Sequence, residues 1–272
     1  MAVDYRRALE EGELEPVLAA WHRGGETRRR LIKLLAPQAI RWGERLVAGP
    51  EESRRLAAAL LGAWPGAPEP ALELLHALAA DPDGRTRELA ARAAGELLAR
   101  RFPEVYPTLG AWRTDPEPGV RRAVALAVGT GARPERLDWA APLLELLEPL
   151  LTDRTPEVRA ALGPRVLARE LFSVYPDDTF EYLAHWSTSH DPQVLWHVAM
   201  GLSGPPAAQR VRRSLILLRR LALDERRYVL GAVAAALRRL GSLAPDPVLS
   251  ELKRWLSDEG RAPVARAVLG KL

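Results

Sequence analysis

Residues 74–98 read LLHALAADPDGRTRELAARAAGELL, which is two apolar helical runs separated by an Asp-Pro turn. The arrangement returns as WRTDPEPGVRRAVALAV at residues 112–128 and as LLTDRTPEVRAALGPRVLA at residues 150–168. The Asp that marks each turn recurs at spacings of 34, 38, 38, 33 and 34 residues, at Asp81, Asp115, Asp153, Asp191, Asp224 and Asp258. A period of this length with two helices per unit is typical of a solenoid of stacked helix pairs.

The rest of the chain fits the same all-α architecture. Apolar residues recur at helical spacing almost everywhere, and no segment shows sustained alternation of apolar and polar residues. Turns rich in Pro and Gly separate the helices, and no stretch has the composition of a flexible linker. We therefore expect residues 1–272 to form one repeat array, less regular over residues 1–80 and with regular Asp-initiated repeats over residues 81–272.

Composition argues against several classes of protein. The chain has no Cys, so disulfides and thiolate metal sites are excluded. No apolar run approaches the ~20 residues of a membrane span, and we expect a cytoplasmic protein without membrane contact. The spacing of His185, His190 and His197 does not predict a metal site, and no Gly-rich loop predicts a cofactor.

The recurring Asp has a structural interpretation that suffices by itself. An Asp at the N-cap of a helix accepts hydrogen bonds from unpaired amides, and its charge suits the positive end of the helix dipole. A catalytic role for one of these carboxylates is the alternative.

An Arg follows six residues after three of these Asp residues, at Arg87, Arg121 and Arg159. Such an Arg could reach the Asp of the next unit and form a ladder that fixes the repeat spacing. Alternatively, it could line the inner surface and bind phosphates. If Arg121 has the structural role, Arg122 is the better candidate for binding.

Positive charge is concentrated in residues 192–245, where nine Arg stand against Asp224 and Glu225. Such a concentration indicates a polyanionic partner, and the preference for Arg over Lys favours bidentate phosphate contacts. We expect these arginines to converge on a single basic surface. A solvated basic face, or the composition of a GC-rich or heat-adapted genome, is the alternative reading.

Residues 85–200 carry further motifs with characteristic spacing. They are Pro103 ahead of Trp112, Asp115-Pro116 with Val120-Arg121-Arg122, Arg133-Pro134 leading to Trp139, Asp153 to Arg159, Trp186, and Leu195-Trp196-His197. This pattern resembles the HEAT-like alkylpurine DNA glycosylases, the AlkC and AlkD superfamily, and the AlkC branch in particular. The resemblance implies a right-handed HEAT-like solenoid of about seven antiparallel helix pairs. It also implies an enzyme that wraps duplex DNA and excises N3- or N7-alkylated purines.

The carboxylates that this chemistry needs are missing from the positions where the family pattern has them. A fixed negative charge must stabilise the cationic sugar that forms when the base departs. Thr130 stands where the family pattern has Glu, Arg92 stands where it has an earlier Glu, and Leu167-Ala168 replace Asn-Asp. Glu88, Glu96 and Glu170 lie nearby and are the only candidate substitutes, so we expect the usual glycosylase activity to be absent.

The chain has eight Trp and only three Phe. Trp112, Trp139, Trp186 and Trp196 fall in the resembling region, where they could stack on a base or sugar. The alternative is that they fill gaps between repeats, as most Trp in helical repeats do. Trp139 is our first choice for a ligand surface because it follows the Arg-Pro pair.

The leading hypothesis is therefore a nucleic-acid-binding protein that contacts duplex DNA without a cofactor. Its candidate binding residues are Arg87, Arg121, Arg122, Arg159, Arg165, Arg212, Arg213, Arg219, Trp139, Trp186 and Trp196. The alternatives are a scaffold that receives a protein or peptide in its groove, and an active glycosylase that uses the displaced Glu residues.

Overall fold

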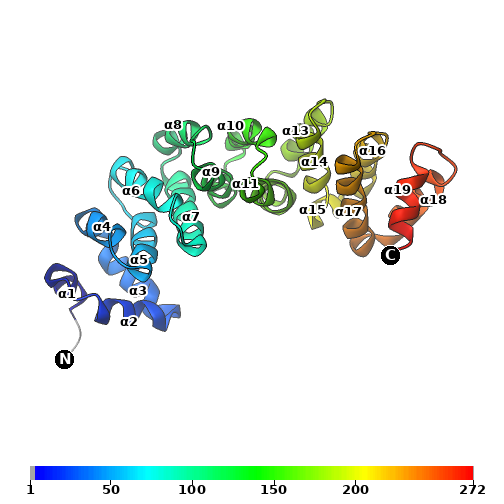
Figure 1. The fold of residues 1–272 in the computed structure, drawn as a ribbon. Coiled ribbons are helices and arrows are strands. Elements are labelled where there is room, and N and C mark those ends of the chain that lie inside the picture. The colour runs from blue at the N-terminus through cyan, green and yellow to red at the C-terminus, as the bar shows by residue number, and fades with distance from the viewer. Residues whose placement is uncertain (1–3, 272) are drawn as a thin grey trace. The chain divides into compact units, whose positions relative to one another are not determined.

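A computed structural model describes residues 4–271. Every regular element in this range is helical (Figure 1). By contacts the chain divides into two compact units, one running to Gly131 and the other starting at Ala132.

The first unit holds α1 to α9. Their bounds are α1 Tyr5–Glu11, α2 Glu15–Arg23, α3 Gly25–Leu35, η1 Ala36–Gln38, α4 Ala39–Val47, α5 Glu51–Gly62, α6 Glu69–Ala79, α7 Gly84–Arg100, α8 Phe102–Trp112 and α9 Pro118–Gly131.

The second unit holds the remaining elements. Their bounds are η2 Leu137–Trp139, α10 Ala140–Leu147, η3 Glu148–Thr152, α11 Pro156–Ala161, η4 Leu162–Leu171, α12 Phe172–Val174, α13 Pro176–Trp186, α14 Pro192–Gly201, α15 Pro205–Gln209, α16 Val211–Leu221, α17 Arg227–Leu243, α18 Pro245–Trp255 and α19 Ala262–Leu269.

Helix pairs follow one another along the chain, as the period predicts. From α4 onward seven pairs can be counted in the described residues: α4/α5, α6/α7, α8/α9, α10/α11, α13/α14, α16/α17 and α18/α19. In the first unit the second helices of the pairs stack on one another, with α7 between α5 and α9. In the second unit α14 packs between η4 and α17, while the first helices form their own contacts, α10 with α13 and α16 with α18. Each unit thus has a first-helix layer and a second-helix layer.

Small residues let the second helices approach closely. A side-chain carbon added to Gly95 of α7 would lie 2.7 Å from the carbonyl oxygen of Ala127 in α9. Because no larger residue fits, the α7–α9 contact depends on this glycine.

The recurring Asp residues differ from the prediction in one respect. Asp191 is an N-cap, and its carboxylate accepts the amide of Gln193. The carboxylates of Asp81, Asp115, Asp153 and Asp224 also accept the amide two residues later, but there the turn precedes the helix, which begins three residues after the Asp. A Pro after Asp81 and after Asp115 has no amide to offer, so the next amide is the first one available.

Helix α7 is capped by Asp83 instead of Asp81. The carboxylate of Asp83 accepts both the amide and the hydroxyl of Thr86. Burial raises the pKa of Asp83, but these hydrogen bonds and one from Arg55 outweigh that effect and lower the pKa to about 2.

The helix after Asp153 changes its winding at Gly163-Pro164. Helix α11 ends at Ala161 and continues as η4, a π-helix. Pro164 lacks the amide that an α-helix would need, and its ring crowds the preceding turn, so a wider turn is accommodated here.

Candidate nucleic-acid interface

Three helices of the second-helix layer bring together an Arg and two aromatic rings. Arg159 of α11 lies 5.3 Å from the centre of the Trp196 ring on α14, and its guanidinium donates a hydrogen bond of 3.2 Å to the Tyr228 hydroxyl on α17. The Trp196 and Tyr228 rings are stacked, with centroids 6.1 Å apart and planes 16° from parallel. Trp196 is half-buried and the side chain of Tyr228 is 38% exposed. We call Arg159, Trp196 and Tyr228 the Arg–aromatic cluster.

Buried polar side chains hold the cluster from below. The Tyr228 hydroxyl donates a hydrogen bond of 2.7 Å to Oε1 of Gln193, whose amide nitrogen lies 3.2 Å from Nε2 of His197. His197 is completely buried. Burial, and then the charge of Arg159, lower the pKa of His197 to about 3, so the imidazole is neutral at ordinary pH.

Two further cations lie on α17. Arg227 is exposed and Arg238 is half-buried, and neither forms an ion pair within residues 4–271. They are eleven residues apart, which puts them on the same side of the helix at about 16 Å along its axis. Between them Gly231 faces open space, since an added side-chain carbon would meet no atom within 4 Å. The surface of α17 between Arg227 and Arg238 is thus positively charged and has no side chain at Gly231.

The other two Arg residues of the repeated motif contact backbone. Nη1 of Arg87 donates to the carbonyls of Asp81 and Pro82, and Nη1 of Arg121 donates in the same way to Asp115 and Pro116. Inter-repeat pairs of the ladder type do occur, but through different residues: Arg54 pairs with Asp81 at 2.5 Å, and His76 lies 2.8 Å from Asp115. Arg159 differs because it turns toward the aromatic rings.

Two of the other candidate Arg residues pair with candidate carboxylates. Arg122 pairs with Glu88 at 2.6 Å, which links α9 to α7, and Arg165 pairs with Glu170 at 3.0 Å within η4. The five-residue separation of Arg165 and Glu170 matches the π-helical winding. Arg122 and the two carboxylates are therefore engaged in ion pairs in this structure.

The arginines of residues 192–245 do not gather on one layer, which corrects the expectation of a single basic surface. Arg212, Arg213 and Arg219 lie on α16, in the first-helix layer. Arg213 covers the Phe180 ring at 4.3 Å, and Arg219 pairs with Glu251 at 2.5 Å, so both contact a neighbouring helix of their own layer. Arg212 is exposed.

Trp139 and Trp186 are core residues here, which contradicts their choice as stacking surfaces. Their exposed fractions are 6% and 4%. The Trp139 ring is covered by the Arg136 guanidinium at 4.3 Å, and the Trp186 indole donates to Glu148. Their large rings fill gaps between helices, so neither face is open to a base. Trp196 is the remaining candidate.

Comparison with known proteins bears on the fold. The family model described as HEAT repeats matches residues 39–129 and again residues 71–162. Residues 39–162 are HEAT repeats. No curated protein matches the chain at a significant level.

Solved structures with helical repeats align with the HEAT repeats and with most of the chain. YibA from Escherichia coli is 17% identical with a TM-score of 0.41, over 99% of this chain and 98% of that one. AlkD2 from Streptococcus mutans is 15% identical with a TM-score of 0.32, over 100% and 92%. A designed armadillo repeat protein for modular peptide recognition is 17% identical with a TM-score of 0.26, over 95% and 99%.

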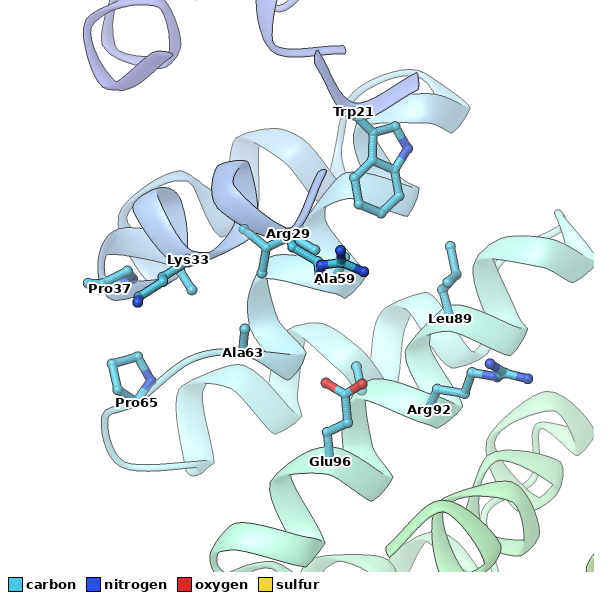
Figure 2. A pocket seen from close by; sticks show the side chains of 13 residues that line it. Trp21, Arg29, Lys33, Pro37, Ala59, Ala63, Pro65, Leu89, Arg92 and Glu96 are labelled. Atoms are coloured by element: carbon cyan, nitrogen blue, oxygen red, sulfur yellow. The ribbon is translucent and has the colours of Figure 1, made fainter. Parts of the chain in front are cut away.

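Beside the first HEAT repeats lies a pocket that the sequence did not reveal. It has a volume of about 620 Å³ and is framed by α2, α3, α5 and α7 (Figure 2). Glu96, one of the candidate carboxylates, lies on its wall together with Arg92. No local sequence pattern indicates the pocket, because its walls come from helices up to seventy-five residues apart, between Trp21 and Glu96.

Residues 4–271 contain neither a candidate membrane-spanning helix nor a candidate metal-binding cluster. None of the helices there is both long and apolar enough to cross a membrane. Within the same range no three His, Asp or Glu side chains are grouped so that they could hold a metal ion.

Proposed function

We propose that this HEAT-repeat protein binds a nucleic acid through the second-helix layer of its second unit. The Arg–aromatic cluster carries the proposal. A stacked aromatic pair that is partly exposed offers a platform for a base, and the adjacent guanidinium of Arg159 suits a phosphate. Because Tyr228 is held by Gln193 and Arg159, the platform is ordered before a ligand arrives.

Arg227 and Arg238 support the same proposal. Neither forms an ion pair within the described residues, so their charges are available to a polyanion. The open surface at Gly231 lets a nucleic-acid backbone approach α17 between them. The resemblance of residues 85–200 to alkylpurine DNA glycosylases favours duplex DNA as the ligand and alkylation repair as the context.

A binding experiment tests the proposal. Fluorescence anisotropy would be measured with a labelled 20-nucleotide single strand and a 20-base-pair duplex between about 50 and 200 mM salt, the range in which phosphate contacts lose affinity steeply. We expect Trp196→Ala to cost about 1–3 kcal/mol of binding free energy, as loss of one stacked base does. Joint Arg227→Gln and Arg238→Gln should reduce the slope of log K against log salt by about 1.8 for duplex.

A matched control removes the same charge from the other layer. Joint Arg212→Gln and Arg220→Gln changes two exposed arginines of α16 and should leave the slope nearly unchanged. Equal effects of the two double variants would mean attraction by net charge alone. Absence of binding to either nucleic acid at the lowest salt concentration would end the proposal.

A further inference from the structure

The pocket of the first unit is not used by the proposed function. Its volume of about 620 Å³ falls in the range of roughly 300–1,000 Å³ that is usual for ligand sites. It exists because α3 and α7 both pack on α5, whose residues between them are small. Ala59 and Ala63 leave a hollow there that a Leu at either position would reduce.

The lining combines an apolar floor with a positive rim. Ile32, Ala59 and Leu89 contribute apolar surface, and Trp21 closes one end (Figure 2). Three cations lie at the edge, Arg29 and Lys33 from α3 and Arg92 from α7, against the single carboxylate Glu96. The pocket therefore favours an anionic ligand that has an apolar part.

Two of these cations are available to a ligand. Arg29 is paired with Glu26 at 2.8 Å, but Lys33 is exposed and forms no ion pair within residues 4–271. Arg92 lies 3.5 Å from the carboxylate of Glu88, which pairs more closely with Arg122, at 2.6 Å. The side chain of Arg92 is 58% exposed.

The positions of Lys33 and Arg92 select among anionic ligands. Figure 2 shows them on opposite sides of the opening, one on α3 and the other on α7. An amphipathic acid with one head group places its charge at one end and can satisfy one side only. A peptide that carries carboxylates before and after an apolar side chain can satisfy both while the apolar side chain fills the floor.

We propose that this pocket is a docking site for an acidic segment of a partner protein. An apolar side chain of the segment packs against Ile32, Ala59 and Leu89. Carboxylates on its two sides pair with Lys33 and Arg92. The site is separate from the Arg–aromatic cluster and does not depend on nucleic-acid binding.

The test uses the full chain and two defined peptides. A fluorescein-labelled peptide, Glu-Glu-Asp-Leu-Leu-Asp-Glu-Glu, is titrated by anisotropy beside the basic peptide Lys-Lys-Lys-Leu-Leu-Lys-Lys-Lys. We expect the acidic peptide to bind with a Kd below about 1 mM, the weak end of specific recognition, and the basic peptide not to bind. Lys33→Gln and Arg92→Gln should each weaken binding by about two- to fivefold, as loss of one exposed ion pair does. Leu89→Asp should weaken it by about tenfold or more, because it places a charge on the apolar floor.

An exposed cation of the second unit provides the control. Arg212→Gln removes an exposed cation from the second unit and should leave peptide binding unchanged. Circular dichroism of each variant checks that the helices are retained. Failure of the acidic peptide to bind at 1 mM, equal binding of the basic peptide, or indifference to all three pocket variants would overturn the proposal. Tight binding of laurate that the pocket variants abolish, without peptide binding, would assign the site to a single-headed acid and also overturn it.

Discussion

His197 shows how one position departs from the repeated motif. Arg87, Arg121 and Arg159 stand six residues after the marking Asp, and His197 stands six residues after Asp191. It is buried under the Arg–aromatic cluster, and its Nδ1 has no hydrogen-bond partner in the described structure. A second Arg here would bring a full charge into the core beside Arg159, whereas a neutral imidazole avoids that cost.

The lowered pKa of His197 predicts a pH dependence of stability. The unfolded chain binds a proton at His197 below about pH 6.5, whereas the folded protein does so only below about pH 3. Protonation therefore favours the unfolded state, and stability falls as the pH drops from 6.5 toward 3. Between pH 7.5 and 5 the wild type should lose about 2 kcal/mol more than a His197→Leu variant.

Urea unfolding at the two pH values measures this difference. The other histidines titrate in both proteins and cancel in the comparison. Equal acid sensitivity of wild type and variant would show that His197 is not held neutral by the fold.

At the scale of elements, the helical period predicted which residues of α16 are buried but not which layer the helix belongs to. The spacing predicts a stripe of Val211, Leu215, Leu218 and Ala222, of which the last three are buried and Val211, at the start of the helix, is half-buried. Both layers consist of amphipathic helices with the same period, so the pattern cannot separate α16 from α17. That is why the basic segment was expected on one surface and is divided between two.

Two glycines provide a matched test of packing in the second-helix layer. A carbon added to Gly163 in η4 would lie 2.9 Å from Nδ1 of His197 and 3.1 Å from the Trp196 ring, whereas one added to Gly231 in α17 meets nothing. Gly163→Ala should destabilise the protein by about 1–3 kcal/mol through overpacking. Gly231→Ala should stabilise it by about 0.5–1 kcal/mol, because Ala restricts the unfolded chain and favours helix.

The midpoint of urea unfolding distinguishes the two variants. Because both are the same chemical change in one layer, their difference isolates the contact with His197 and Trp196. A gain of stability in Gly163→Ala equal to that in Gly231→Ala would mean that η4 can move away from α14 without cost.

For the whole molecule, the ion pairs formed by the candidate carboxylates predict whether the protein can excise alkylated bases. Glu88 and Glu170 are held by Arg122 and Arg165, so neither presents an uncompensated negative charge to a sugar cation. We expect no release of N3- or N7-methylated purines from duplex DNA by the full chain. Release measured by chromatography, and lost in Glu88→Gln, Glu96→Gln or Glu170→Gln, would contradict this expectation.

The sequence predicts more of the fold than of the candidate site. The Asp period and the apolar spacing predicted an array of helix pairs, and the HEAT-repeat match and the helices of residues 4–271 confirm it. For the site, Arg159 and Trp196 were named, but Tyr228 was not, because an aromatic residue near a helix start carries no signal of its own. Trp139 and Trp186 could not be told from Trp196 by composition or spacing, since all three stand in similar helical patterns.

The sequence by itself determined the elements of this protein, because helix formation, capping and the repeat period depend on residues close together in the chain. Tertiary structure alone decided which side chains meet: the stack of Trp196 on Tyr228, the pairing of Arg122 with Glu88, and the pocket between α3 and α7. These contacts join positions about thirty to seventy residues apart. Local patterns cannot specify them, because a side chain's partner depends on the packing of neighbouring repeats.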